Sequence, residues 1–186
     1  MSRLILVRHA APLVDPSRPS AQWDLSAGGR LAARELAAKL ARFAPASIFT
    51  GPEPKQRQTG EEIADVLSAP MTVLAGLAEH QRRSTSYVGR DQFEDSIRGL
   101  FAEPERVVYG DESGEGTYAR FADAVDRALA GHGTAPVAAV SGGTAISLFV
   151  SRRSRIEPFS LWKSLTTPTA LVIDRETWAI EEILTL

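Results

Sequence analysis

The stretch Leu4-Ile5-Leu6-Val7-Arg8-His9 decides the fold that the sequence predicts. Its four apolar side chains, all branched, are typical of a strand buried on both faces in the middle of an α/β sheet. Open α/β sheets bind ligands beyond the carboxyl ends of such strands, where Arg8 and His9 would lie. A fixed cation beside a nucleophile is what phosphoryl transfer through a histidine needs, whereas a surface pair that merely ends a strand would have no chemical role. The residues around this strand have to distinguish these two interpretations.

Helices and strands alternate along the chain in the order expected of a parallel or mixed sheet covered by helices. The predicted strands are 4–7, 47–50, 71–73, 137–140, 171–173 and 180–184, and the predicted helices are 27–43, 55–67, 91–101, 117–130 and 145–150. We therefore expect a three-layer α/β/α fold with a central, mostly parallel sheet, in a single domain that spans residues 1–186. Residues 11–24 are predicted to form a long loop, and the irregular segment 79–116 is a candidate cap over the sheet edge.

The composition excludes several classes of protein. Without cysteine the chain cannot form disulfides or use a thiolate, and its three histidines, at positions 9, 80 and 132, have no metal-binding spacing. The net charge of −2 argues against a general nucleic-acid or anionic-membrane surface. The first ten residues hold too short an apolar run for a secretory signal, and no longer run follows. We expect a cytoplasmic, metal-independent protein that uses no cofactor and binds neither nucleic acid nor membranes; its oligomeric state stays open.

Five short motifs occur in order between the predicted elements. They are Leu6-Val7-Arg8-His9-Ala10, Leu25-Ser26-Ala27-Gly28-Gly29, Thr50-Gly51-Pro52-Glu53-Pro54-Lys55 with Thr59, Leu77-Ala78-Glu79, and Glu112-Ser113 with Arg120. Together they resemble the motifs of the histidine phosphatase superfamily, which includes the cofactor-dependent phosphoglycerate mutases and many small phosphomonoesterases. The resemblance covers nearly the whole chain and implies a phosphoglycerate mutase-like fold. A chain of 186 residues has little room for the insertions of the long mutases, which favours a phosphatase.

The resemblance implies a role for four of these residues. His9 corresponds to the nucleophile, since a neutral imidazole can attack phosphorus and carry the phosphoryl group covalently. The guanidinium of Arg8 suits two phosphoryl oxygens at once, and Lys55 adds a point charge where the family usually has a second arginine. Glu79 corresponds to the proton donor, which would need a raised pKa to protonate the leaving group and then activate water.

Structural interpretations compete with these roles. Lys55 is also compatible with a solvated lysine in the first turn of a helix, and Glu79 with a surface carboxylate. His80 is a candidate pocket residue that would bind phosphate together with Arg82, although a loop histidine without a role is the simpler interpretation.

The sharpest departure from the family lies at Val140-Ser141-Gly142-Gly143-Thr144. The family usually has a second histidine here that contacts the phosphoryl group, and Gly142 stands in its place. Ser141, Gly142 and Gly143 are candidates for phosphate binding at the start of the following helix. Loss of one preorganised donor typically lowers turnover by about 10²–10³-fold.

We therefore expect a weakened phosphomonoesterase that acts on a small phosphorylated metabolite through a phospho-His9 intermediate. Two alternatives stay open. One is a catalytically silent relative that binds a phosphorylated ligand, free phosphate or a protein partner. The other is an active enzyme into which a change from histidine to Gly142 was introduced.

Overall fold

A six-stranded mixed sheet forms the centre of the computed structural model, which describes residues 2–186. The strands are β1 (Arg3–Arg8), β2 (Ser47–Thr50), β3 (Met71–Val73), β4 (Val137–Ser141), β5 (Thr169–Asp174) and β6 (Ile180–Leu184). They lie in the order β3-β2-β4-β1-β5-β6. The pairs β1–β4, β2–β4 and β2–β3 are parallel. β5 runs antiparallel to both β1 and β6. The predicted α/β fold with a mostly parallel sheet is confirmed.

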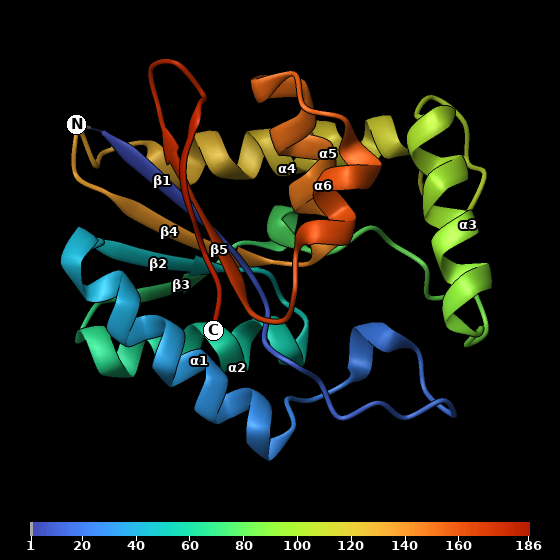
Figure 1. Cartoon of the computed structure of the whole chain (residues 1–186), viewed down its shortest axis with the longest axis horizontal. Helices are drawn as coiled ribbons and strands as arrows, with labels where there is room; N and C mark the ends of the chain where they lie inside the picture. The colour runs from blue at the N-terminus through green and yellow to red at the C-terminus, as the bar shows by residue number, and fades with distance from the viewer. Residues whose placement is uncertain (1) are drawn as a thin grey trace.

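Helices cover both faces of this sheet (Figure 1). They are α1 (Ala27–Leu40), α2 (Pro54–Leu67), α3 (Arg90–Ala102), α4 (Gly114–Leu129), α5 (Gly143–Ser154) and α6 (Pro158–Ser164). α1 and α2 lie on one face, and α4, α5 and α6 lie on the other, with α3 at one end of the molecule next to α6. Within residues 2–186 no helix is both long and apolar enough to cross a membrane.

The apolar run of β1 is buried on both faces, as the sequence predicts, and each of its four side chains is 0% exposed. Leu4 and Leu6 pack toward α4 and α5, while Ile5 and Val7 pack toward α1 and α2. Burying each such side chain stabilises the fold by about 1.5–3 kcal/mol. The strand is therefore held rigidly, and it carries Arg8 and His9 to the edge where the parallel strands end.

Helix caps explain where the observed helices agree with the predicted ones and where they differ. Ser26 caps α1 as predicted, because its hydroxyl accepts a hydrogen bond from the Gly29 N–H at 3.0 Å. α4 begins at Gly114, earlier than predicted, because the hydroxyl of Ser113 accepts from the Gly116 N–H. A helix that the sequence did not predict is α6, which has seven residues and starts with a proline after the capping carboxylate of Glu157.

Candidate active site

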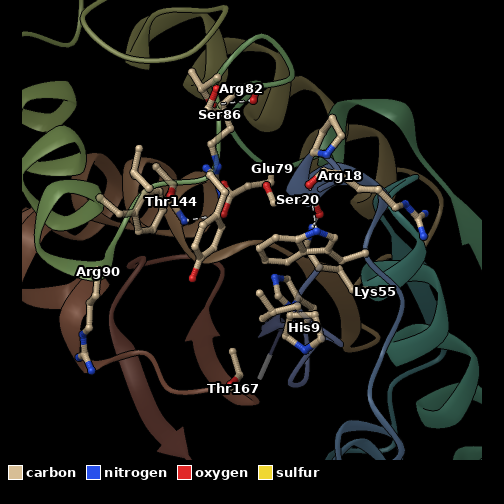
Figure 2. A pocket seen from close by; sticks show the side chains of 18 of the residues that line it. His9, Arg18, Ser20, Lys55, Glu79, Arg82, Ser86, Arg90, Thr144 and Thr167 are labelled. Atoms are coloured by element: carbon tan, nitrogen blue, oxygen red, sulfur yellow. Dashed lines mark hydrogen bonds between the residues drawn. The ribbon is translucent and has the colours of Figure 1, made fainter. Parts of the chain in front are cut away.

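Five of the predicted site residues line one cavity of about 310 Å³ at the carboxyl end of β1, namely Arg8, His9, Lys55, Glu79 and Arg82. Its walls come from the loop 11–24, from the segment 82–93, and from the starts of α2 and α5, and Figure 2 shows these side chains around it. Segments far apart in the sequence therefore meet where the sheet topology predicts a ligand site.

His9 is a buried, neutral imidazole at this cavity. Its side chain is 7% exposed, and Nδ1 lies 2.9 Å from the carbonyl oxygen of Ala10. Since a carbonyl only accepts, Nδ1 carries the proton and Nε2 keeps its lone pair. Burial and then the charge of Lys55 lower the pKa of His9 to about 3. The ring is thus in the form that can attack phosphorus at neutral pH.

Arg8 is fixed against the start of α5. Its Nη1 donates to the carbonyl oxygen of Leu165, while its Nε is buried and has no partner. The Cβ that Gly143 lacks would lie 3.1 Å from this Nε, so α5 approaches the guanidinium closely. The close approach of α5 leaves one donor of Arg8 without an acceptor in the protein.

Lys55 is buried rather than solvated, with 3% of its surface exposed. Its ammonium donates to the carboxylate of Glu53 at 2.5 Å and to the carbonyl oxygen of Ser20. The interpretation as a solvated first-turn lysine is therefore wrong. Because Glu53 balances its charge, Lys55 adds less positive potential to the cavity than the sequence alone suggests.

The carboxylate of Glu79 occupies the N-terminus of α5. Its Oε2 accepts from the Thr144 N–H at 3.0 Å, and its Oε1 accepts from the N–H groups of Ala145 at 2.8 Å and His80 at 2.7 Å. At 5% exposure it is not a surface carboxylate. Burial by itself would raise the pKa of Glu79, but Arg82 and these three N–H groups outweigh it and lower the pKa below its ordinary value. The expected raised pKa is thus wrong for the free protein, since the helix N-terminus stabilises the ionised form.

The carboxylate of Glu79 occupies the space in which a side chain at position 142 would lie. A Cβ at Gly142 would overlap the Oε2 and Cδ atoms of Glu79 and would lie 2.8 Å from its Cβ. Ser141 is fully buried, and its hydroxyl donates to the carbonyl oxygen of Leu77 at 2.6 Å. Neither Ser141 nor the two glycines Gly142 and Gly143 line the cavity. In the first turn of α5, the N–H groups of Thr144 and Ala145 bind Glu79.

The structure separates the two candidate pocket residues of the loop after Glu79. Arg82 lines the cavity, lies 5.1 Å from the centroid of the Phe93 ring, and has a buried Nη1 without a partner. His80 does not line this cavity: its Nε2 lies 2.9 Å from the carbonyl oxygen of Glu112, and its ring stacks on Tyr109. His80 therefore packs against Glu112 and Tyr109 and not against this cavity.

The sequence analysis missed the outer wall of the cavity. This wall holds the aromatic side chains Trp23, Tyr87, Phe93, Tyr109 and Trp162 and the cations Arg18 and Arg90. The rings of Trp23 and Tyr87 come from different loops, and their centroids lie 6.1 Å apart. The length of the loop 11–24 was the one feature of the sequence that indicated a functional wall here. The contact between Trp23 and Tyr87 could not be predicted, because the two residues lie far apart in the sequence.

The buried neutral state of His9 predicts that acid destabilises the fold. The pKa of this histidine is about 3 in the folded protein and 6.5 as its ordinary value, so unfolding takes up a proton between these limits. The free energy of unfolding should therefore fall as the pH drops below 6.5, by up to about 1.4 kcal/mol per pH unit. Denaturant titrations of the protein and of His9→Asn measure the two slopes. Their difference isolates His9, because Glu79 and His80, whose pKa values are also lowered, are present in both proteins. His132→Asn is the control, and equal slopes in the protein and in His9→Asn would contradict the prediction.

Comparisons with known proteins agree with this architecture. A family model described as "Histidine phosphatase superfamily (branch 1)" matches residues 4–184. YhfR of Bacillus stearothermophilus has a similar structure, with a TM-score of 0.74 and 18% identity over 97% of this chain and 96% of that one. A mycobacterial glucosyl-3-phosphoglycerate phosphatase in complex with VO3 has a TM-score of 0.70 and 21% identity, over 92% of each chain.

A third similar structure is a mutant phosphoserine phosphatase from Entamoeba histolytica in complex with phosphoserine. Its TM-score is 0.71, and its identity is 14% over 98% of this chain and 96% of that one. At such identities these likenesses establish the fold. No curated protein matches the chain in sequence. Within residues 2–186, no cluster of three or more acidic or histidine side chains is arranged to hold a metal ion.

Proposed function

The chain belongs to branch 1 of the histidine phosphatase superfamily, and we propose that it is a phosphomonoesterase that works through a phospho-His9 intermediate. The observation that carries the proposal is the neutral imidazole of His9 beside the guanidinium of Arg8 at one cavity. The similar phosphatases, named for a phosphorylated sugar acid and a phosphorylated amino acid, support a small phosphorylated metabolite as the substrate. A cavity of about 310 Å³ suits a ligand of that size.

In the first step, Nε2 of His9 attacks phosphorus while the bond to the leaving oxygen breaks. The carbonyl of Ala10 accepts from Nδ1–H and stabilises the positive charge that develops on the ring. The phosphoryl group keeps its charge on three oxygens, so cations aimed at those oxygens contribute most to catalysis. Arg8 and Lys55 are the cations next to His9. Their positive charges lower the pKa of His9, because they disfavour a second positive charge on its ring. The proposal needs no metal ion, because the protein supplies both nucleophile and counter-charge.

Glu79 is the proposed proton donor, although it is ionised in the free protein. A bound phosphoester brings a second negative charge beside its carboxylate, and like charges disfavour each other, which raises the pKa of Glu79. A proton taken up with the substrate would then go to the leaving oxygen. The resulting carboxylate would accept a proton from the water that attacks phospho-His9. Because the resting pKa is low, this proton uptake adds to the barrier, and we propose slow turnover.

One observation favours the alternative of a silent binding protein. Glu79 occupies the N-terminus of α5, and no side chain at Gly142 donates to a phosphoryl group. Such a protein would still bind a phosphoryl group, since Arg8 keeps an unpaired donor, but it would catalyse its transfer poorly.

Turnover and trapping of the intermediate distinguish the enzyme from the silent binder. The purified protein, in EDTA, would be given an aryl phosphate and a panel of metabolite monoesters, and labelled phosphate would be sought on His9 after a rapid quench. We expect slow turnover and an acid-labile, alkali-stable label. If there is neither turnover nor label, while inorganic phosphate raises the melting temperature, the protein is the silent binder and the proposed function is wrong.

A further inference from the structure

One hydroxyl in the cavity wall is buried without a hydrogen-bond partner. Thr144 lies in the first turn of α5, and its side chain is 1% exposed. Its Oγ1 has no hydrogen-bond partner among the described residues 2–186. The same side chain lines the cavity. A buried polar group without a partner destabilises the free protein, and an absent ligand is one physical explanation for it.

Two further unpaired donors lie at the same cavity. The buried Nε of Arg8 faces the start of α5 at Gly143, the residue that directly precedes Thr144. The buried Nη1 of Arg82 also lacks an acceptor, and Figure 2 shows Arg82, Glu79 and Thr144 grouped in one part of the wall. Three buried donors without acceptors at one cavity fit a ligand rich in acceptors, and an anion forms the strongest hydrogen bonds with such donors.

Glu79 does not satisfy these donors, although it lies among them. Its two oxygens accept from three main-chain N–H groups, one of which belongs to Thr144, and the hydroxyl of Thr144 is left over. The same carboxylate fills the space next to Gly142. A donor for the phosphoryl group therefore has to come from a different position in the first turn of α5, and Thr144 is the residue of that turn that lines the cavity.

We propose that the hydroxyl of Thr144 donates a hydrogen bond to an oxygen of the phosphoryl group, beside Nε of Arg8, and supplies the donor that Gly142 lacks. The inference rests on the proposed function, since it deepens the same site. Thr144 is then a phosphate-binding residue that compensates in part for the missing second histidine. This role also explains the unpaired hydroxyl. In the free protein an apolar side chain of the same shape would pack equally well, so the hydroxyl has a use only when a ligand is bound.

Calorimetric titration with inorganic phosphate tests this role. In Thr144→Val, which keeps the shape and removes the hydroxyl, we expect phosphate affinity to fall about 10- to 100-fold, as for a hydrogen bond to a charged group. The melting temperature without phosphate should not fall, because the hydroxyl has no partner to lose. The matched control is Ser147→Ala, since Ser147 on the same helix also has a buried, unpaired hydroxyl but does not line the cavity. This control should bind phosphate like the parent protein.

Thr144→Ser and Thr144→Ala form a second pair that differs only in the hydroxyl. We expect the serine variant to keep most of the affinity and the alanine variant to lose it, and this pair decides the question if Thr144→Val does not fold. Unchanged affinity in Thr144→Val or Thr144→Ala overturns the inference, and so does a parent protein that binds no phosphate. The proposed function fails separately: phosphate binding that depends on Thr144, without any turnover by the parent, supports this contact and excludes the phosphatase.

Discussion

Replacing His9 with alanine should abolish turnover of an aryl phosphate, with a loss of about 10³-fold or more, as is typical when a covalent nucleophile is removed. No other imidazole among residues 2–186 lines the cavity, so nothing replaces the nucleophile. The fold should persist, because the one hydrogen bond that the ring makes within residues 2–186 goes to the neighbouring carbonyl of Ala10. Steady-state rates, with a circular dichroism spectrum of the variant, provide the measurement.

His132→Ala is the control for this prediction, since His132 contacts Ser47 outside the cavity. It should keep the rate of the parent protein. His9→Ala should still bind inorganic phosphate, because Arg8 and Thr144 remain. If His9→Ala retains turnover, phospho-His9 is not the intermediate, and water must attack the substrate directly.

Gly142→His, which would reintroduce the family's second histidine, should inactivate and destabilise the protein rather than improve it. Even a Cβ at this position overlaps the carboxylate of Glu79, so the new side chain has to expel that group. The N–H groups of Thr144 and Ala145 then lose their acceptor. Buried donors left unpaired cost about 1–3 kcal/mol each, so losing the acceptor of these two groups should lower the free energy of unfolding by roughly 2–6 kcal/mol. Denaturant titration and aryl phosphate turnover measure the two effects.

Gly28→His is the matched control, because a Cβ at Gly28 meets no atom within 4 Å. It should cost little stability and leave turnover unchanged. The double variant Glu79→Ala with Gly142→His should recover part of the stability, since the carboxylate no longer overlaps the new side chain and only the Cβ of residue 79, 2.8 Å away, has to shift. It should not recover the turnover. A gain in turnover by Gly142→His alone would mean that Glu79 moves aside readily. That result would favour the alternative in which Gly142 was introduced into an active enzyme.

The close fit between Glu79 and Gly142 bears on how far a motif can be interpreted alone. From the sequence, Gly142 is a vacant position and Glu79 is a separate proton donor. In the structure they form one packing unit, because the carboxylate lies where a side chain at 142 would begin. The same contact reverses the expected direction of the pKa of Glu79, since it places the carboxylate on the N–H groups of α5. A substitution at one position therefore cannot be interpreted without the other.

The sequence by itself determined the α/β class, the six strands and five of the six α-helices of residues 2–186, and the family. Buried strands require apolar runs and surface helices require a periodic apolar face, and both patterns are local. It therefore also determined that Arg8 and His9 lie where β1 ends. The tertiary structure alone decided the ionisation of Glu79, the burial of Lys55 and the place of Thr144, with its buried and unpaired hydroxyl, in the cavity wall. A pKa and a packing contact depend on groups that the fold brings together from distant parts of the chain, and no local pattern records those distances.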